Sequence, residues 1–211
     1  MRQERRLGGL AVALFAILST NCGGSSTSSS TSPSTTPAVT FHGETSDAAG
    51  DAVVSAGVAN PPDLVRGTVD VAGNVITFTI QFASGTMNAQ TTRLTIQLDT
   101  DQNPATGVPG GNGVGIDYIL DVWPVRAQQT LVQQAQPASC TGGGACYTDV
   151  GAVSASLGTD TVSTTVPLAM LGNASGRMNY RVFAYASPQT TAPTVVADVM
   201  PDITGAPAHV P

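Results

Sequence analysis

A period of two in the placement of apolar side chains is the feature of this sequence that most restricts its fold. Apolar and polar residues alternate over 65–71 and again over 76–82, and the two runs flank a turn at Gly73 and Asn74. Successive side chains of a strand point to opposite faces of a sheet, so this alternation indicates strands with one buried face. Two such runs around a Gly-Asn turn predict a β-hairpin.

Further strand-like segments follow along the chain. They cover residues 93–98, 115–123, 129–134, 147–156, 160–166 and 177–186. Loops rich in Gly, Pro, Asn and Asp separate them, which is typical of short antiparallel strands. We therefore predict an all-β fold, a jelly-roll-like antiparallel β-sandwich, with at most one short helical turn near 167–172. Pro167 suits the first position of such a turn and Gly172 suits its exit.

The same alternation predicts which side chains of the segment 115–123 share a face. The buried face is expected to carry Ile116, Tyr118, Leu120 and Val122. The opposite face is expected to carry Asp117, Ile119, Asp121 and Trp123.

The charged residues argue against two other classes of protein. The chain has no Lys, only 10% of its residues are charged, and its formal net charge is −6. Long surface helices rich in Glu and Lys are therefore not expected. The five Arg residues beyond residue 60 are too few and too scattered for a basic surface, so no nucleic-acid partner is expected.

The N-terminus has the organisation of an export signal. Three Arg residues in the first six positions precede an apolar stretch over 7–18, and Cys22 follows shortly after it. This order resembles a bacterial lipoprotein signal, in which the Cys becomes the lipidated N-terminus. A plain secretory signal cut nearby is the alternative, and either signal exports the protein.

A tract of Ser, Thr and Pro covers residues 25–37. Such a composition offers too little apolar surface to form a packed core, so it suits a tether. We predict a signal peptide over 1–21, a lipidated Cys22 with its tether over 22–38, and a β-sandwich domain over 39–211. The domain is expected at the bacterial cell envelope or surface, held to the membrane through its lipid anchor.

Two further cysteines, Cys140 and Cys146, flank a short loop that contains three glycines. The loop is flexible enough to close, and an exported protein meets oxidising conditions, so we predict a disulfide. A redox or metal-binding pair is the weaker alternative, because redox motifs usually have two residues between the cysteines and no His lies nearby.

An acidic loop follows the strand predicted at 93–98. Asp99, Asp101 and Asn103 alternate in it, and pairing with the segment 115–123 places Asp117 nearly opposite Asp99. Oxygen ligands at this spacing suit Ca²⁺, which takes 6–8 of them. These four residues are the first candidates for a structural Ca²⁺ site. A solvated turn is the alternative, since Asp, Asn and Pro are common turn residues.

A second acidic pair, Asp47 and Asp51, lies closer to the N-terminus. It could supply ligands to the same cation site or to another one. The turn interpretation is the stronger of the two for this pair.

The order of several short motifs resembles that of the DOMON-like β-sandwiches, which include the family 9 carbohydrate-binding modules. The motifs lie at 47–51, 62–65, around Phe78, and at 98–101, 115–118 and 166–168. The resemblance covers residues 44–202. It implies a β-sandwich that binds a sugar or haem and contains structural calcium.

Sugar binding requires aromatic platforms, for which Trp123, Tyr147 and Tyr185 are the candidates. The alternative for each is an aromatic side chain that packs in the core or covers a sheet. Haem is not expected, because the cytochrome members of the family bind it through Met and His. The two His residues, His42 and His209, lie near the ends of the domain.

Catalysis is not expected. The acidic residues that a glycosidase would need cluster in a way that better suits a cation, and no nucleophile-elbow motif accompanies either His. The sequence therefore predicts an exported, membrane-anchored, non-catalytic binding module that calcium stabilises and whose ligand is a carbohydrate. The alternative function is a structural or adhesion module that contacts a protein of the cell envelope.

Overall fold

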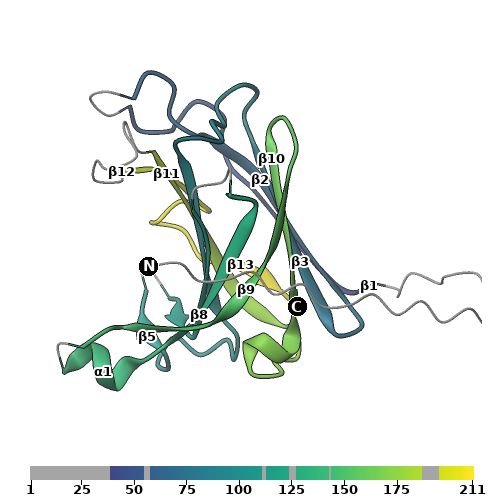
Figure 1. Ribbon diagram of the computed structural model, residues 1–211, viewed down its shortest axis with the longest axis vertical. Coiled ribbons are helices and arrows are strands. Elements are labelled where there is room, and N and C mark those ends of the chain that lie inside the picture. The colour runs from purple at the N-terminus through teal and green to yellow at the C-terminus, as the bar shows by residue number, and fades with distance from the viewer. Residues whose placement is uncertain (1–38, 55–57, 111–112, 124–126, 143, 187–194) are drawn as a thin grey trace, which may run out of the picture. The chain divides into compact units, whose positions relative to one another are not determined.

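The structure is a computed structural model that describes residues 39–54, 58–110, 113–123, 127–142, 144–186 and 195–211 (Figure 1). The predicted signal peptide, Cys22 and the Ser/Thr/Pro tether lie outside the described residues.

Antiparallel β-strands make up most of the regular structure of the described chain, so the predicted all-β fold is confirmed. The first seven strands are β1 (Val39–Ser46), β2 (Leu64–Ala72), β3 (Val75–Phe82), β4 (Thr92–Asp99), β5 (Val108–Pro109), β6 (Gly115–Ile116) and β7 (Tyr118–Val122). The others are β8 (Gln129–Ala135), β9 (Tyr147–Leu157), β10 (Thr161–Pro167), β11 (Met178–Ala186), β12 (Val195–Met200) and β13 (Ala208–Val210).

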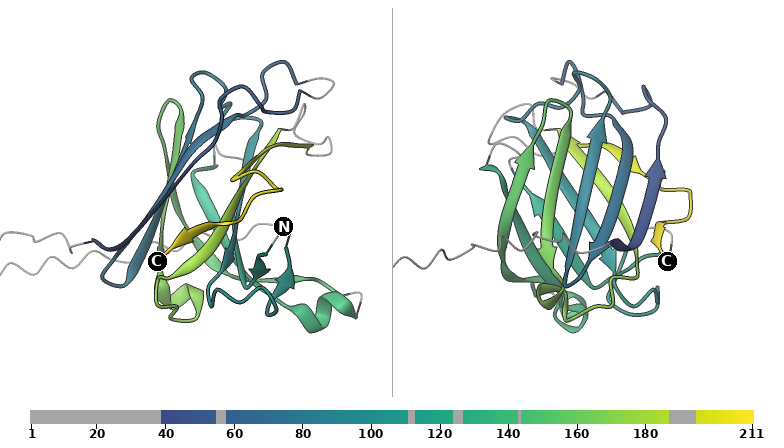
Figure 2. Two further views of the ribbon diagram at one scale, coloured as in Figure 1. Left: turned by 180° about the vertical axis from the view of Figure 1, so that it is seen from behind. Right: turned by 90° about the vertical axis from the view of Figure 1, so that its right-hand side faces the viewer.

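One continuous sheet wraps into two facing layers (Figure 2). Its strand order is β1-β2-β3-β10-β9-β8-β7-β4-β11-β12, and β13 pairs with β11 beside this path. The long strand β9 joins the layers, because its C-terminal part pairs with β10 and the rest of it pairs with β8. On the opposite side β13 comes against β1, which nearly closes the sandwich into a barrel.

The predicted hairpin is formed by β2 and β3, which pair around the turn at Gly73 and Asn74. Alternate side chains of both strands enter the main core, as the period of two predicts. That core lies between the layers, where Phe78 packs edge-to-face against Tyr180 of β11 with 6.2 Å between the ring centroids.

The predicted face of Ile116 is wrong. The strand breaks at Asp117, whose N–H donates to the carbonyl of Leu98 and whose own carbonyl accepts the N–H of Ala135. Because of this break, Ile116 pairs with β5 and packs in a small second core together with Ile119. Tyr118 and its alternate neighbours enter the main core as expected.

The structure adds a helix to the one predicted helical turn. The predicted turn is the 3-10 helix η2 (Leu168–Leu171), which Gly172 ends in the left-handed conformation. The additional helix is α1 (Pro137–Thr141), which begins with Pro at its first position and ends at Gly142. Among the described residues, no helix is long and apolar enough to cross a membrane.

The predicted disulfide is confirmed. Cys140 and Cys146 are joined, with their Cα atoms 4.3 Å apart. Both cysteines pack with Tyr147 against the second core. The bridge therefore holds the arm that carries α1, which projects from one end of the sandwich (Figure 1).

Candidate functional site

The loop after β4 brings three of the predicted calcium ligands together. Asp99, Asp101 and Asp117 each offer a carboxylate oxygen within 4.8 Å of the others. Asp99 is fully buried at the end of β4, and Asp117 stands opposite it because Leu98 pairs with Tyr118. The sequence thus predicted this grouping correctly.

Protein donors already satisfy the carboxylates of this loop. The two oxygens of Asp99 accept hydrogen bonds from the N–H of Asn103 at 2.9 Å and from Nδ2 of Asn179 at 3.2 Å. Asp117 Oδ2 accepts both the N–H and the hydroxyl of Thr100. This bonding agrees with an Asx-rich turn that holds its own shape.

The other two predicted ligands, Asp101 and Asn103, are also bonded within the loop. Asp101 accepts the hydroxyl of Thr106 at 3.0 and 3.1 Å. The side-chain oxygen of Asn103 accepts the N–H of Ala105. A cation bound here would compete with donors that are in place.

A cavity of about 420 Å³ opens beside this loop. Asp101, Asp117 and Gln134 contribute polar groups to it, and Tyr118 and Leu171 contribute apolar surface. A small polar ligand would find hydrogen-bond partners there.

The second acidic pair, Asp47 and Asp51, belongs to a larger cluster that the sequence did not predict. Asp63, Asp198 and Asp202 join it, and we call these five residues the five-aspartate centre. Their oxygens form two groups within 4.8 Å that share Asp51. One group contains Asp47, Asp51 and Asp202, and the other contains Asp51, Asp63 and Asp198.

Backbone hydrogen bonds bring these separate segments together. Asp63 Oδ2 accepts the N–H of Gly50 at 2.7 Å, which ties the loop after β1 to the start of β2. Asp198 of β12 accepts the N–H of Leu64 through Oδ2 at 2.6 Å, across 134 positions of sequence. The N–H of Val53 donates to the carbonyl of Ala197, so the same loop is also tied to β12.

Arg181 positions the remaining member of the centre. This side chain is fully buried in β11, and it donates to the carbonyls of Ile203 and Gly205 at 3.2 and 2.7 Å. It therefore holds the turn after β12 against the sheet, and Asp202 lies in that turn.

The centre concentrates negative charge. Burial raises the pKa of Asp47 to about 6, with the charges of Asp198, Asp51 and Asp202 adding to the effect. Burial likewise raises the pKa of Asp198 to about 6, helped by Asp51 and Asp63. In the part of the chain that the structure describes, none of these carboxylates pairs with an Arg or a His.

Two oxygen atoms of the five-aspartate centre stand out. Asp63 Oδ1 and Asp47 Oδ2 are buried and have no hydrogen-bond partner among the described residues. Buried carboxylate oxygens are normally bonded, because burial of an unpaired charge is unfavourable. One member of the centre is marked in the sequence, since Asp198 interrupts the apolar run of β12. The residues that Asp198 approaches lie far away along the chain, so the sequence did not reveal the cluster.

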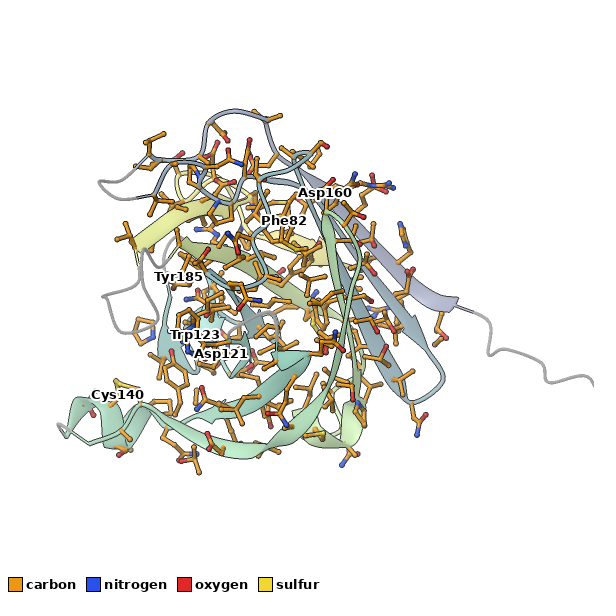
Figure 3. All side chains as sticks on the ribbon, turned by 45° about the horizontal axis from the view of Figure 1, so that its top comes forward. Phe82, Asp121, Trp123, Cys140, Asp160 and Tyr185 are labelled. Carbon is orange, nitrogen blue, oxygen red and sulfur yellow. A yellow bond between two sulfur atoms is a disulfide. The ribbon has the colours of Figure 1, made fainter. Side chains whose placement is uncertain are left out.

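The predicted ligand-binding aromatics divide between two environments. Trp123 is 36% exposed, and Tyr185 is half-buried beside it on the outer face of β4, β7 and β11 (Figure 3). Tyr147 is half-buried and packs against the second core. Trp123 and Tyr185 are therefore brought together, while the ring of Tyr147 is engaged in packing.

Arg93 joins Trp123 and Tyr185. Its guanidinium carbon lies 5.7 Å from the ring centre of Trp123 and 5.4 Å from that of Tyr185. Asp121 orients the guanidinium, since Nε and Nη2 of Arg93 donate to its two oxygens at 2.7 and 2.8 Å. We call these four residues the Arg93 face.

The Arg93 face is a polar and aromatic surface of the kind that sugars contact. The Nη1 group of Arg93 stays outside its pair with Asp121, and Trp123 is partly exposed to solvent. The sequence indicated the aromatics and Asp121, and the alternation pointed Arg93 outward, but neither indicated that Arg93 contacts both rings.

The two His residues are engaged near β1 and β13. His42 Nδ1 lies 2.7 Å from Asp70 Oδ1, and this hydrogen bond raises the pKa of His42. His209 Nδ1 lies 3.1 Å from the side-chain oxygen of Asn179.

A scan of the chain against protein-family models gives no match, and a search of curated proteins gives none either. The functional argument therefore depends on the residues described above.

Proposed function

We propose that the protein is an exported, membrane-anchored binding module without catalytic activity, and that its ligand is a carbohydrate. The carrying observation is the Arg93 face, where Asp121 holds a guanidinium that contacts the rings of Trp123 and Tyr185. Aromatic surface beside charged hydrogen-bonding groups matches the alternating apolar and hydroxyl faces of a sugar ring.

The physical chemistry of the Arg93 face supports a ligand of low charge. The positive charge of Arg93 is balanced by Asp121, so the face does not select strongly for anions. A neutral saccharide can stack on Trp123 while its hydroxyls accept hydrogen bonds from Arg93. A structural Ca²⁺ is part of the proposal, and the residues that would hold it are argued in the next subsection.

A glycan array probed with the purified full chain tests the ligand. Binding of a defined set of glycans is expected, and Trp123→Ala should weaken it at least about tenfold, which corresponds to about 1.4 kcal/mol. The matched control is Gln134→Ala in the cavity beside Asp117. Loss of binding in the control alone would move the site to that cavity, and no binding on the array would refute the ligand.

A second function has a specific observation in its favour. Exposed apolar side chains line the cavities at the five-aspartate centre. Val53, Val196 and Ile203 line the cavity that opens onto Asp51, Asp198 and Asp202, and Val54 lines a second cavity with Asp63. Apolar side chains grouped at a surface are typical of protein contacts. An adhesion module would bind an envelope protein there, and Val54→Asp would weaken that contact without any effect on glycan binding.

Anchoring is tested separately. Expression of the full chain in a bacterium that is fed radiolabelled palmitate should label the protein, and Cys22→Ser should remove the label. Secretion of the unlabelled wild-type chain would instead support a plain secretory signal.

A further inference from the structure

We propose that the five-aspartate centre binds Ca²⁺, with the ion held by Asp51, Asp63 and Asp198 and with Asp47 and Asp202 beside it. This site differs from the acidic loop at 98–107. The inference deepens the proposed function, which includes a structural Ca²⁺, and its test does not depend on glycan binding.

The first argument is the state of Asp63. Its side chain is only 5% exposed, one of its oxygens accepts the N–H of Gly50, and its Oδ1 has no hydrogen-bond partner among the described residues. A carboxylate of Asp63 lies within 4.8 Å of those of Asp51 and Asp198. A cation bound by these three carboxylates would compensate the buried charge of Asp63.

The second argument is the balance of charge. Five carboxylates gather with no Arg or His paired to them in the described part of the chain. Like charges at this separation repel unless protons or a cation compensate them. A divalent ion compensates two charges at once and leaves the backbone hydrogen bonds of Asp63 and Asp198 intact.

The third argument is the contrast with the acidic loop at 98–107. There the carboxylate oxygens of Asp99 accept hydrogen bonds from Asn103 and Asn179, so the buried charge already has partners. The carboxylate of Asp198 in the five-aspartate centre is bonded in the same way, by the N–H groups of Leu64 and Val199. Of the two acidic clusters, only the five-aspartate centre contains buried oxygens without partners among the described residues, and these belong to Asp63 and Asp47.

The chemistry of the donors selects the ion. All the groups are carboxylates, which suit hard cations, and no His or Cys belongs to the cluster, which argues against Zn²⁺. Oxygens on opposite sides of a Ca²⁺ ion lie about 4.8 Å apart, twice the ordinary bond length of ~2.4 Å. Oxygens within 4.8 Å of one another can therefore reach a single Ca²⁺ ion.

An ion can reach this site from solvent, and once bound it would connect separate parts of the fold. A cavity of about 180 Å³ opens onto Asp51, Asp198 and Asp202, so an ion can enter from solvent. The ligands belong to the loop after β1, the start of β2 and strand β12. A bound ion would therefore link the two edges of the sandwich, as the hydrogen bond from Leu64 to Asp198 already does.

Calorimetric titration of the purified full chain with CaCl₂, after removal of metal with EDTA, tests the inference. One Ca²⁺ per chain is expected, together with a rise in melting temperature. Asp51→Asn and Asp63→Asn should each weaken binding at least about tenfold. Asp51 is exposed and Asn at position 63 can still accept the N–H of Gly50, so both variants are expected to fold.

Asp101→Asn in the acidic loop is the matched control. It should leave the affinity for Ca²⁺ within about twofold of the wild type, because dissolved salt screens the effect of a distant charge. Three results would overturn the inference. They are no calcium binding by the wild-type chain, unchanged binding in both Asp51→Asn and Asp63→Asn, and loss of binding in the control alone. None of these results depends on whether a glycan binds.

Discussion

Arg93 and Asp121 form a two-point ion pair across β4 and β7, with nitrogen–oxygen distances of 2.7 and 2.8 Å. Their side chains are 30% and 15% exposed. The pair combines planar hydrogen bonding with the contacts of Arg93 to Trp123 and Tyr185. It therefore fixes the orientation of the one cation on the Arg93 face.

A double-mutant cycle on this pair, with Arg93→Ala and Asp121→Ala, should give a coupling free energy of about 1 kcal/mol, measured by urea unfolding. The matched control is the pair of Arg66 and Glu44, which has the same two-point geometry but is half-exposed. Solvent screens that pair, so its coupling should be smaller. Equal coupling in the two pairs would contradict the importance of partial burial.

Tyr180 carries a hydroxyl that is buried in the main core without a hydrogen-bond partner among the described residues. Tyr180→Phe removes this group and keeps the ring packed against Phe78. The free energy of unfolding should stay unchanged or rise by about 0.5–1 kcal/mol, because an unbonded buried hydroxyl is unfavourable. Urea unfolding measures the change.

Thr130→Val serves as the control for Tyr180, since the buried hydroxyl of Thr130 donates to that of Thr164 at 2.8 Å. That variant should lose stability. A loss of more than ~1 kcal/mol in Tyr180→Phe would instead reveal a bonded hydroxyl.

The bridge between Cys140 and Cys146 spans a sequence separation of 6. Closing so short a loop restricts the unfolded chain enough to contribute about 2 kcal/mol. Reduction of the wild-type protein should lower its urea midpoint, and the double variant Cys140→Ser, Cys146→Ser should match the reduced wild type. A reducing agent should leave the double variant unchanged, and an equal midpoint for oxidised and reduced wild type would argue against any stabilisation.

The pH dependence of the metal-free protein follows from the raised pKa values of Asp47 and Asp198, both about 6 in the folded state. Between about pH 4 and pH 6 the folded protein holds more protons than the unfolded chain, so stability falls as the pH rises. In EDTA the melting temperature should therefore be higher at pH 5 than at pH 7.

Asp47→Asn should reduce the change of melting temperature with pH, because Asn does not titrate. Asp149→Asn, on the exposed part of β9, is the control and should keep the wild-type slope. A melting temperature that increases from pH 5 to pH 7 in EDTA would contradict the assignment.

Local patterns predicted much of the fold. The alternation over 65–71 and 76–82 predicted β2 and β3, because each strand of that hairpin buries one face. The same reasoning failed at Ile116, because the strand is interrupted at Asp117 and the preceding residue packs in the second core. A period of two carries no information about such a break.

Proximity in sequence also decided which part of the acidic sites could be predicted. Asp99 and Asp101 lie two positions apart in one loop, and the pairing of neighbouring strands predicted the approach of Asp117. Asp63 and Asp198 are 135 positions apart, and they meet only because β12 packs beside the start of β2.

The sequence by itself therefore determined the alternating strands between residues 65 and 186, the disulfide and the acidic loop, since each depends on residues that are close along the chain or in adjacent strands. It did not predict β1, β5, β12 or β13. Only the tertiary structure decided the five-aspartate centre and the contacts of Arg93 with two rings. Both depend on packing between distant strands, and packing also sets the burial that deprives Asp63 Oδ1 of a partner among the described residues. Burial is a property of the folded chain. The sequence alone therefore could not distinguish the hydrogen-bonded acidic loop at 98–107 from the candidate ion site at the five-aspartate centre.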